Sequence, residues 1–438
     1  MLRPGGGMVD AGGLNPPDEK SSCGFDSRPG HCSRQHVPHR VPHRRGPSPQ
    51  PRQNESMTLG IDDHRTASQV RTALDLQRDA MIADLEQFVN VESPSLEADC
   101  LERSAHFLAD LMTRVLGKPP TIIQSDRGPH VHWKGSDDTK VLIVGHHDTV
   151  FPRGTVARRP FTREGNIGRG PGIFDMKAGI VQAIYGVAAV KEWWHTEILI
   201  TADEEVGSHA SRALLEDRAK AAGAVLVLEP SADGGALKIA RKGTGTFTVS
   251  IAGRAAHAGL EPEKGINALV ELAAQVPRIV ALANPAMGTT VTPTVAKAGT
   301  ADNVVPDAAT IAVDVRCVIP EEKDRLEREM SRLSATLPGA TVTVSGGLNR
   351  PPLHEKMTTE LFGVAERVAR DYGIAGLQGV AVGGGSDGNI TAAVGVRTLD
   401  GLGAVGAGAH AETEHVRLDL MPERAALVAG LVQAIVNA

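Results

Sequence analysis

The chain has 438 residues, a length that exceeds one hydrophobic core and favours two or more domains. Its composition, 41% hydrophobic and 22% charged with 3% aromatic residues, is that of a globular protein. A net charge of −6 gives no basic footprint for nucleic acid or an anionic membrane, and no apolar run is long enough to cross a bilayer. The sequence has no basic-then-apolar leader, and its four cysteines form no disulfide framework, so it predicts a cytoplasmic protein.

Residues 1–65 differ in composition from the rest of the chain. They are rich in Pro, Gly, Arg and His, as in HVPHRVPHRRGPSPQPRQ, and show no hydrophobic period. Such a segment buries too little apolar surface to offset its ordering entropy, so we predict a disordered extension rather than a histidine-rich metal tract. We also expect Met57 to be the true start of the protein.

A regular pattern begins at about residue 66. Apolar residues at helical spacing predict helical structure over 70–89 and a second helix over about 98–116. Three apolar runs of strand length follow: KVLIVGH ending at His146, EILITADEE ending at Glu205, and AVLVLEP at 224–230. Helices are expected between these runs, at about 175–191 and 209–221. This alternation predicts an α/β fold, a mostly parallel sheet with helices on both faces.

The middle of the chain, residues 243–348, has a different pattern. Strands are expected at TFTVSIAG, ATIAVDVRCV and ATVTVSG, and helices at 265–282 and about 321–335. The large-domain pattern resumes afterwards, with helices near 356–372 and 422–436. We therefore expect a large domain built from 66–242 and 349–438, with a smaller α+β domain inserted at 243–348.

Potential metal ligands stand at the end of each of the three strand-like runs. His146 and Asp148 follow the first run, Glu204 and Glu205 the second, and Glu229 the third. In open parallel sheets, ligands collect outside the carboxyl ends of the strands. Each residue alone is more often a solvated loop residue. Their joint occurrence at matching positions predicts one shared site.

Two further candidates lie in glycine-rich segments. Asp175 is expected to open a helix in GPGIFDMKAG, where the helix dipole favours a carboxylate. Taken alone, Asp175 is more simply interpreted as the N-cap of that helix. His410 follows GLGAVGAGA, after the strand-like VRTLD. The adjacent Asp203, Glu204 and Glu205 repel one another, and a nearby dication would relieve that repulsion.

Six segments in order, GHHDTV, GPGIFDMKAG, TADEEVGS, LEPS, GRAAHAG and GAGAH, resemble the signatures of a metallopeptidase family. It is the two-zinc family of glutamate carboxypeptidase, aminoacylase, acetylornithine deacetylase and succinyl-diaminopimelate desuccinylase. Among its branches, the segments resemble the glutamate carboxypeptidase branch most. The resemblance implies that His146 and Glu229 hold one metal, that Glu205 and His410 hold another, and that Asp175 bridges them. It also implies that the inserted domain is a lid, which can form a homodimer.

The expected chemistry follows from this ligand set. Imidazoles and carboxylates without thiolate suit two zinc ions, with cobalt or manganese as alternatives. A shared water would attack the carbonyl, and Glu204 would be its general base. The resemblance further implies that Asp148 orients His146 and that His257, from its own or a partner subunit, holds the oxyanion. It assigns contacts with the substrate's carboxylate to Asn303, Arg316 and Arg350, although Arg316 could instead pair with a surface acid.

We therefore predict a hydrolase that cleaves the amide bond of a small peptide or N-acyl amino acid with a free carboxylate next to the scissile bond. The alternatives are a biosynthetic N-deacylase of the acetylornithine or succinyl-diaminopimelate type and a non-catalytic binding homologue. A dinucleotide site at Gly401-Leu-Gly403-Ala-Val-Gly406 is disfavoured, because the polar continuation AGAHAETEHVRLD has no apolar helical face. These glycines are instead expected to shape the loop that presents His410.

Overall fold

A six-stranded sheet with the order β1-β2-β6-β3-β7-β14 forms the centre of the larger part of the computed structural model, which describes residues 65–438. The predicted disordered extension and its histidines lie outside the described residues, apart from Arg65. Strands β6, β3, β7 and β14 are parallel, whereas β2 pairs antiparallel with β6 and β1 antiparallel with β2. The predicted α/β class is confirmed. The strands are β1 (Thr121–Ile123), β2 (His130–Lys134), β3 (Val141–His146), β6 (Thr196–Thr201), β7 (Ala224–Val227) and β14 (Arg397–Leu399).

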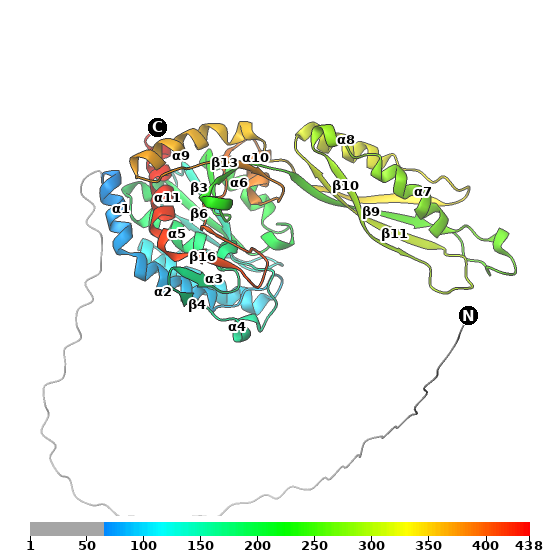
Figure 1. Ribbon diagram of the computed structural model, residues 1–438, viewed down its shortest axis with the longest axis horizontal. Helices are drawn as coiled ribbons and strands as arrows, with labels where there is room; N and C mark the ends of the chain where they lie inside the picture. The colour runs from blue at the N-terminus through cyan, green and yellow to red at the C-terminus, as the bar shows by residue number, and fades with distance from the viewer. Residues whose placement is uncertain (1–64) are drawn as a thin grey trace, which may run out of the picture. The chain divides into compact units, whose positions relative to one another are not determined.

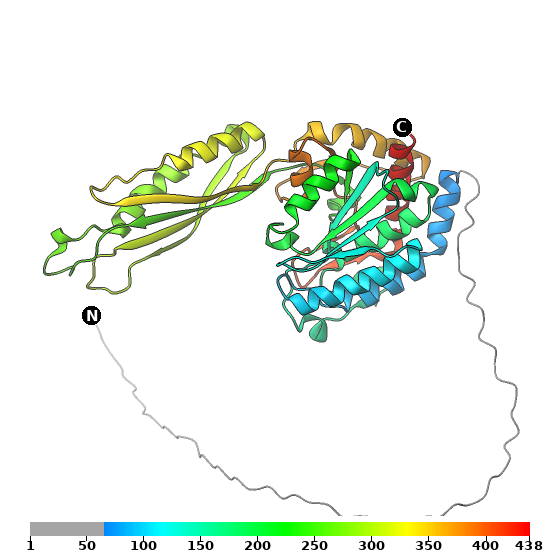
Figure 2. The ribbon, with the colours of Figure 1, turned by 180° about the vertical axis from the view of Figure 1, so that it is seen from behind.

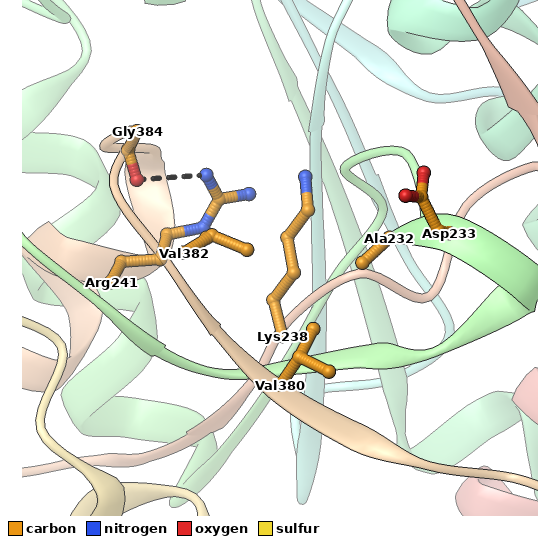
Figure 3. Close-up of a pocket in the computed structure, with 7 residues that line it drawn as sticks. All are labelled: Ala232, Asp233, Lys238, Arg241, Val380, Val382 and Gly384. Atoms are coloured by element: carbon orange, nitrogen blue, oxygen red, sulfur yellow. Dashed lines mark hydrogen bonds between the residues drawn. The ribbon is translucent and has the colours of Figure 1, made fainter.

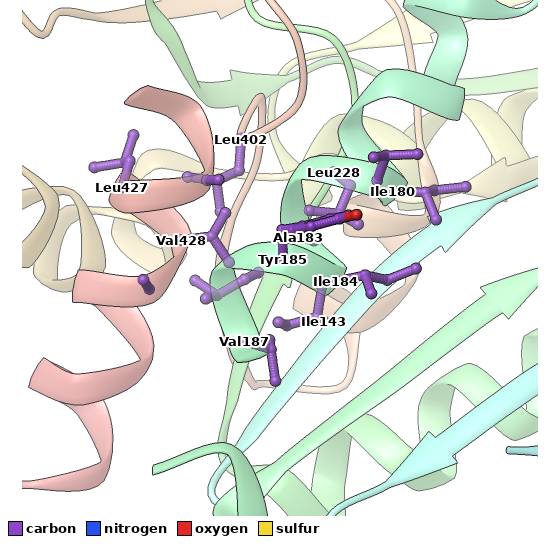
Figure 4. Close-up of a cluster of buried hydrophobic side chains, with 14 of the residues drawn as sticks. Ile143, Ile180, Ala183, Ile184, Tyr185, Val187, Leu228, Leu402, Leu427 and Val428 are labelled. Atoms are coloured by element: carbon purple, nitrogen blue, oxygen red, sulfur yellow. The ribbon is translucent and has the colours of Figure 1, made fainter. Parts of the chain in front are cut away.

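Both faces of this sheet are covered by helices, as the apolar runs predict. Successive side chains of a strand point to opposite faces, and in β3 Ile143 packs into the core beneath α5 and α11 (Figure 4), while Leu142 and Val144 pack with Leu215 of α6. Figure 1 shows α5 beside α11. The first face carries α1 (Ala67–Leu76), α2 (Arg78–Val89), α3 (Ala98–Leu116), α5 (Ala178–Ala188), α9 (Thr359–Asp371) and α11 (Met421–Val436), and the second carries α6 (Arg212–Ala222) and α10 (Asp387–Ala393).

Several predicted element boundaries were wrong. The helical stretch over 70–89 is two helices that meet at Gln77. The strand expected to end at Glu205 stops at Thr201, and Glu204–Val206 forms a short 3-10 turn. Asp175 does not open a helix: its φ of −115° and ψ of 91° are non-helical, and α5 begins three residues later at Ala178. Asp175 therefore does not cap α5, whose N-cap residue is Lys177.

Short elements complete the large part of the chain, and their length gave no period to detect in the sequence. Strand β8 (Leu237–Arg241) pairs parallel with β13 (Gly379–Val382). A second small sheet has the order β15-β16-β5-β4. Its strands are β4 (Thr162–Glu164), β5 (Ile167–Arg169), β15 (Gly406–Ala407) and β16 (His415–Arg417), and the short helix α4 (Thr155–Arg158) precedes them.

The inserted segment has a four-stranded antiparallel sheet of its own, with the order β10-β11-β9-β12. Two helices cover one face of it (Figure 2) and enclose a separate hydrophobic core that includes Val249, Leu272, Ile311 and Leu326. Strand β10 was not predicted, because most of its side chains are exposed. The elements are β9 (Gly243–Ala252), α7 (Ala268–Val280), β10 (Thr290–Ala298), β11 (Ala308–Cys317), α8 (Pro320–Ser331) and β12 (Thr341–Arg350).

The separate core agrees with an inserted α+β domain. Since Thr58–Ala438 forms one unit by its contacts, the exact boundaries at 242/243 and 348/349 stay predictions. Among the helices of residues 65–438, none is both long and apolar enough to cross a bilayer.

Candidate metal centre

The carboxyl ends of the parallel strands bring the predicted ligands together. His146 is the last residue of β3, and Glu204 and Glu229 follow the ends of β6 and β7 closely in sequence. One potential ligand atom from each of His146, Glu204 and Glu229 lies within 4.8 Å of the others, and the same holds for His146, Asp175 and Glu205. The two groups share His146, so they form one continuous cluster.

Asp175 occupies the middle of this cluster. Its Oδ1 is 3.2 Å from Nε2 of His146, and its Oδ2 is 3.3 Å from Nε2 of His410. Nε2 of His410 also lies 3.2 Å from Oε2 of Glu205, and Nε2 of His146 lies 3.8 Å from Oε1 of Glu229. Burial would raise the pKa of Asp175, but its hydrogen bonds with the two histidines lower it, and the contacts with Asp175 and Glu205 raise the pKa of His410 to about 10. Each oxygen of Asp175 thus faces a different candidate ligand, as a bridging carboxylate requires.

The acidic side chains around Asp175 suit a divalent cation. Burial raises the pKa of Glu204, Glu205 and Glu229, because water is excluded from their charged forms. Oε1 of Glu205 is buried and has no hydrogen-bond partner among residues 65–438. A cation would compensate this crowding of negative charge, and the mixed imidazole and carboxylate donors fit zinc. The residues present therefore fit the predicted pair of metal ions.

Asp148 is fully buried behind His146 and makes several contacts. Nδ1 of His146 lies 3.0 Å from the carbonyl oxygen of Asp148 and 3.5 Å from its Oδ1. The same carboxylate accepts hydrogen bonds from Ser95 Oγ at 2.8 Å and from the backbone N–H groups of Glu204 and Glu205, both at 3.2 Å. Asp148 therefore lies where it can orient His146, and it also fixes the turn that carries Glu204 and Glu205.

The predicted lid residues His257 and Asn303 lie on neighbouring segments. The backbone N–H of Ala258 donates to the carbonyl of Asn303 at 2.9 Å. His257 is exposed, and its Nδ1 accepts hydrogen bonds from the backbone N–H groups of Gly259 and Leu260 at 3.1 Å. Within the described part of the chain, neither His257 nor Asn303 has a hydrogen bond with the candidate ligands. The structure brings these two residues together, but not to the metal cluster.

The two predicted clamp arginines both lie opposite Thr244, on the strands that flank β9. Arg316 forms a double hydrogen bond with Asp314, at 3.0 and 2.9 Å, which is the surface-acid alternative. Arg350 instead reaches the predicted base: its Nη2 is 2.7 Å from Oε1 of Glu204 and 2.9 Å from Oγ of Ser208. The structure thus places Arg350, but not Arg316, beside the cluster.

The sequence did not single out Arg241, which supports Glu229 from behind. Its Nη2 donates to Oε2 of Glu229 at 3.1 Å, and its Nε donates to Oδ2 of Asp400 at 2.7 Å. Nη1 donates to the carbonyls of Gly384 and Gly385, both at 3.2 Å. One of several basic residues in LKIARKG looks like part of the solvated face of a strand, so only its burial identifies Arg241.

A cavity of about 440 Å³ adjoins Arg241 on the side of strands β8 and β13 (Figure 3). The side chain of Lys238 points into it, and burial lowers the pKa of this lysine. The Lys238 ammonium has no hydrogen-bond acceptor among residues 65–438, so it could take an anionic group of a ligand. The lining residues are Ala232, Asp233, Lys238, Arg241, Val380, Val382 and Gly384.

Gly403 of the disfavoured dinucleotide motif packs closely against the residues that follow β7. Gly403 donates its N–H to the carbonyl of Glu229 at 2.9 Å, and a Cβ at this position would lie 2.3 Å from the carbonyl oxygen of Leu228. No helix begins at these glycines: strand β15 follows, and then the turn that carries His410. Glycine is therefore required here for the loop that presents His410 beside the cluster.

Comparisons with known proteins agree with this geometry. Residues 142–434 match the peptidase family M20/M25/M40. The chain is 32% identical over 372 residues to carboxypeptidase G2 of Pseudomonas sp. (strain RS-16), covering 81% of this chain and 89% of that protein. The aminopeptidase PepT of Bacillus cereus has a similar fold, with a TM-score of 0.67, 22% identity, and coverage of 82% of this chain and 98% of that one. So does the YXEP protein of Bacillus subtilis, described as a dinuclear metal-binding peptidase, with a TM-score of 0.58, 15% identity, and coverage of 84% and 99%.

Proposed function

The chain belongs to the peptidase family M20/M25/M40 and is a metal-dependent hydrolase, and from this premise we propose that it cleaves the amide bond of a small peptide or N-acyl amino acid whose free carboxylate adjoins the scissile bond. The observation that carries the proposal is the position of Asp175 between His146 and His410, with Glu204 in the same cluster. A protein that only binds a ligand has no need of a buried carboxylate that can serve as a base.

In this proposal the metals are held by His146, Asp175 and Glu229 on one side and by Asp175, Glu205 and His410 on the other. Two divalent ions bound there would polarise the substrate carbonyl and acidify a water molecule. Zinc as the native metal, a homodimer formed through the inserted domain and a cytoplasmic location are further parts of the proposal.

Glu204 would transfer the proton from the attacking water to the leaving amine. Burial raises the pKa of Glu204, which makes its carboxylate a better proton acceptor. Arg350 donates to Oε1 of Glu204, and no residue within 65–438 donates a hydrogen bond to Oε2. Oε2 can therefore hold the proton, while Arg350 and Asp148 fix the side chain and the backbone of Glu204.

The substrate carboxylate would be bound by positively charged side chains next to the cluster. Lys238 supports this step because its ammonium lies in the cavity beside Arg241 and has no acceptor in the described part of the chain. Arg350 could add a second contact, and Asn303 and Arg316 remain the predicted contacts from the lid. A charge-assisted hydrogen bond of this kind contributes about 1.5–3 kcal/mol.

The test is the hydrolysis of matched dipeptides and N-acyl amino acids with free or amidated carboxyl ends. The amount of amine released measures the rate. Amidation should lower kcat/KM of the parent by about 10-fold or more, the equivalent of one charged hydrogen bond. In Lys238→Met, amidation should have a smaller effect, whereas the exposed Lys220→Met is the matched control and should behave as the parent does. Equal cleavage of free and amidated substrates by the parent would contradict carboxylate recognition. A preference for short N-acetyl or N-succinyl amines would favour the deacylase alternative.

A further inference from the structure

Glu414 is a buried carboxylate to which the sequence assigned no role. It is 0% exposed and directly precedes β16. Its Oε1 accepts hydrogen bonds from the backbone N–H groups of Phe174 at 2.8 Å and Asp175 at 2.9 Å. Its Oε2 accepts one from the N–H of Gly172 at 2.9 Å. Within residues 65–438 no Lys or Arg forms an ion pair with Glu414, so its partners are all backbone amides of the turn that carries Asp175.

This turn needs an outside acceptor, because its backbone is not helical at Asp175 and the N–H groups of Phe174 and Asp175 have no other acceptor in the described chain. A buried N–H without an acceptor costs about 1–3 kcal/mol, so the carboxylate selects this one backbone conformation. Convergent amides around one anion form a nest, and here the anion is a side chain of the protein itself.

Glu414 also belongs to the turn that presents His410. The N–H of Ala411 donates to the carbonyl of Gly408 at 2.9 Å, and the N–H of Glu414 donates to the carbonyl of Ala411 at 3.1 Å. These short-range bonds hold the turn in one conformation, so a movement of Glu414 is passed on to His410. The carboxylate of Glu414 therefore ties the His410 turn to the Asp175 turn.

We propose that Glu414 is a positioning residue that sets the separation of Asp175 and His410, and thereby the geometry of the metal site those two residues share. This inference rests on the proposed function. Nε2 of His410 lies 3.3 Å from Oδ2 of Asp175, and a shift of either turn changes that contact directly. Residues behind the ligands of a metal commonly alter its affinity by about 10- to 100-fold.

The variant Glu414→Gln tests the proposal, because it replaces one acceptor oxygen by an NH₂ group that faces an N–H of the turn. Glu412→Gln is the matched control: it lies in the same turn, makes the same charge change and is exposed. The measurements are the affinities for Zn²⁺ and Co²⁺ by chelator competition and the visible absorption spectrum of the Co²⁺ protein. Glu414→Gln should bind one of the two ions about 10- to 100-fold more weakly and should change the Co²⁺ spectrum, whereas Glu412→Gln should match the parent.

The outcomes separate this inference from the proposed function. If the parent itself binds fewer than two ions, the proposed function fails. If the parent binds two ions and Glu414→Gln has the parent's affinities and Co²⁺ spectrum, only the role of Glu414 is overturned. If Glu414→Gln does not fold, hydrogen exchange of the metal-free parent decides: protected amides at Phe174 and Asp175 support the proposal, and fast exchange at both overturns it.

Discussion

Replacing Arg241 with methionine should destabilise the protein strongly, because its guanidinium belongs to a buried network of ion pairs. The guanidinium is 3% exposed and pairs with Asp400, which is 0% exposed, and with Glu229. Removing one partner of a buried ion pair leaves the other charge uncompensated, which costs about 3–5 kcal/mol. Asp400 keeps a hydrogen bond from Ser386 Oγ at 2.6 Å, so the lower end, about 3 kcal/mol, is expected.

Urea unfolding of the metal-free protein, followed by tryptophan fluorescence, measures this cost. Trp133 is fully buried in the central sheet and so reports on the domain that contains Arg241. The control is Arg397→Met, whose ion pair with Glu360 is 42% and 63% exposed and should contribute at most about 1 kcal/mol. If Arg241→Met shifts the unfolding free energy no more than Arg397→Met does, the reasoning about the buried network is refuted.

Three further predictions concern the base, the inserted domain and the tail. Glu204→Gln should keep both metals and lose several orders of magnitude in kcat, because only proton transfer is removed; near-normal kcat would contradict its role as base. In the inserted domain, burial raises the pKa of Glu271, but hydrogen bonds from Gln275, Thr336 and Leu337 lower it overall to about 2. Its stabilisation is therefore present above about pH 4.5 and lost as the pH falls towards 2, and Glu271→Gln should lower the unfolding free energy by about 2 kcal/mol at pH 7 and by less at pH 2.5. If the unfolding free energy of Glu271→Gln depends on pH as strongly as that of the parent, this prediction is contradicted. Deleting residues 1–56 should leave the melting temperature and kcat/KM unchanged, since they carry no hydrophobic pattern, and a marked loss of either would show that they dock on the fold.

The sequence predicted strands β3, β6 and β7 of the central sheet well because they are buried on both faces and read as continuous apolar runs, whereas β1 and β2, which are only partly buried, were not predicted. The same runs located His146 and Glu229, since the ends of parallel strands share one edge of the sheet. Strands β8 and β15 were missed because they are too short to show a period and do not form a continuous apolar run. The inserted sheet was predicted except for β10, whose exposed side chains lack the apolar alternation of a half-buried strand.

The supporting residues of the site could not be predicted in the same way. Asp175 and His410 lie in loops and were assigned by resemblance rather than by any period. Glu414 accepts hydrogen bonds from backbone N–H groups that lie at least 239 residues away in the sequence. Because the donors are backbone groups, the contact requires no particular residue type at the donor positions. Arg241 is recognised only by its burial between Glu229 and Asp400. Contacts of this kind depend on three-dimensional proximity that spacing along the chain does not encode.

The number of divalent ions bound per chain, measured together with amide hydrolysis on the same sample, tests the central claim most directly. The metal-free protein would be loaded with Zn²⁺, freed of excess metal and analysed for zinc and for cleavage of a carboxylate-bearing N-acyl amino acid. We predict two zinc ions per chain, loss of hydrolysis on chelation and its recovery when Zn²⁺ is restored. Only trace zinc after loading, or hydrolysis that persists in the metal-free protein, would contradict a two-metal hydrolase.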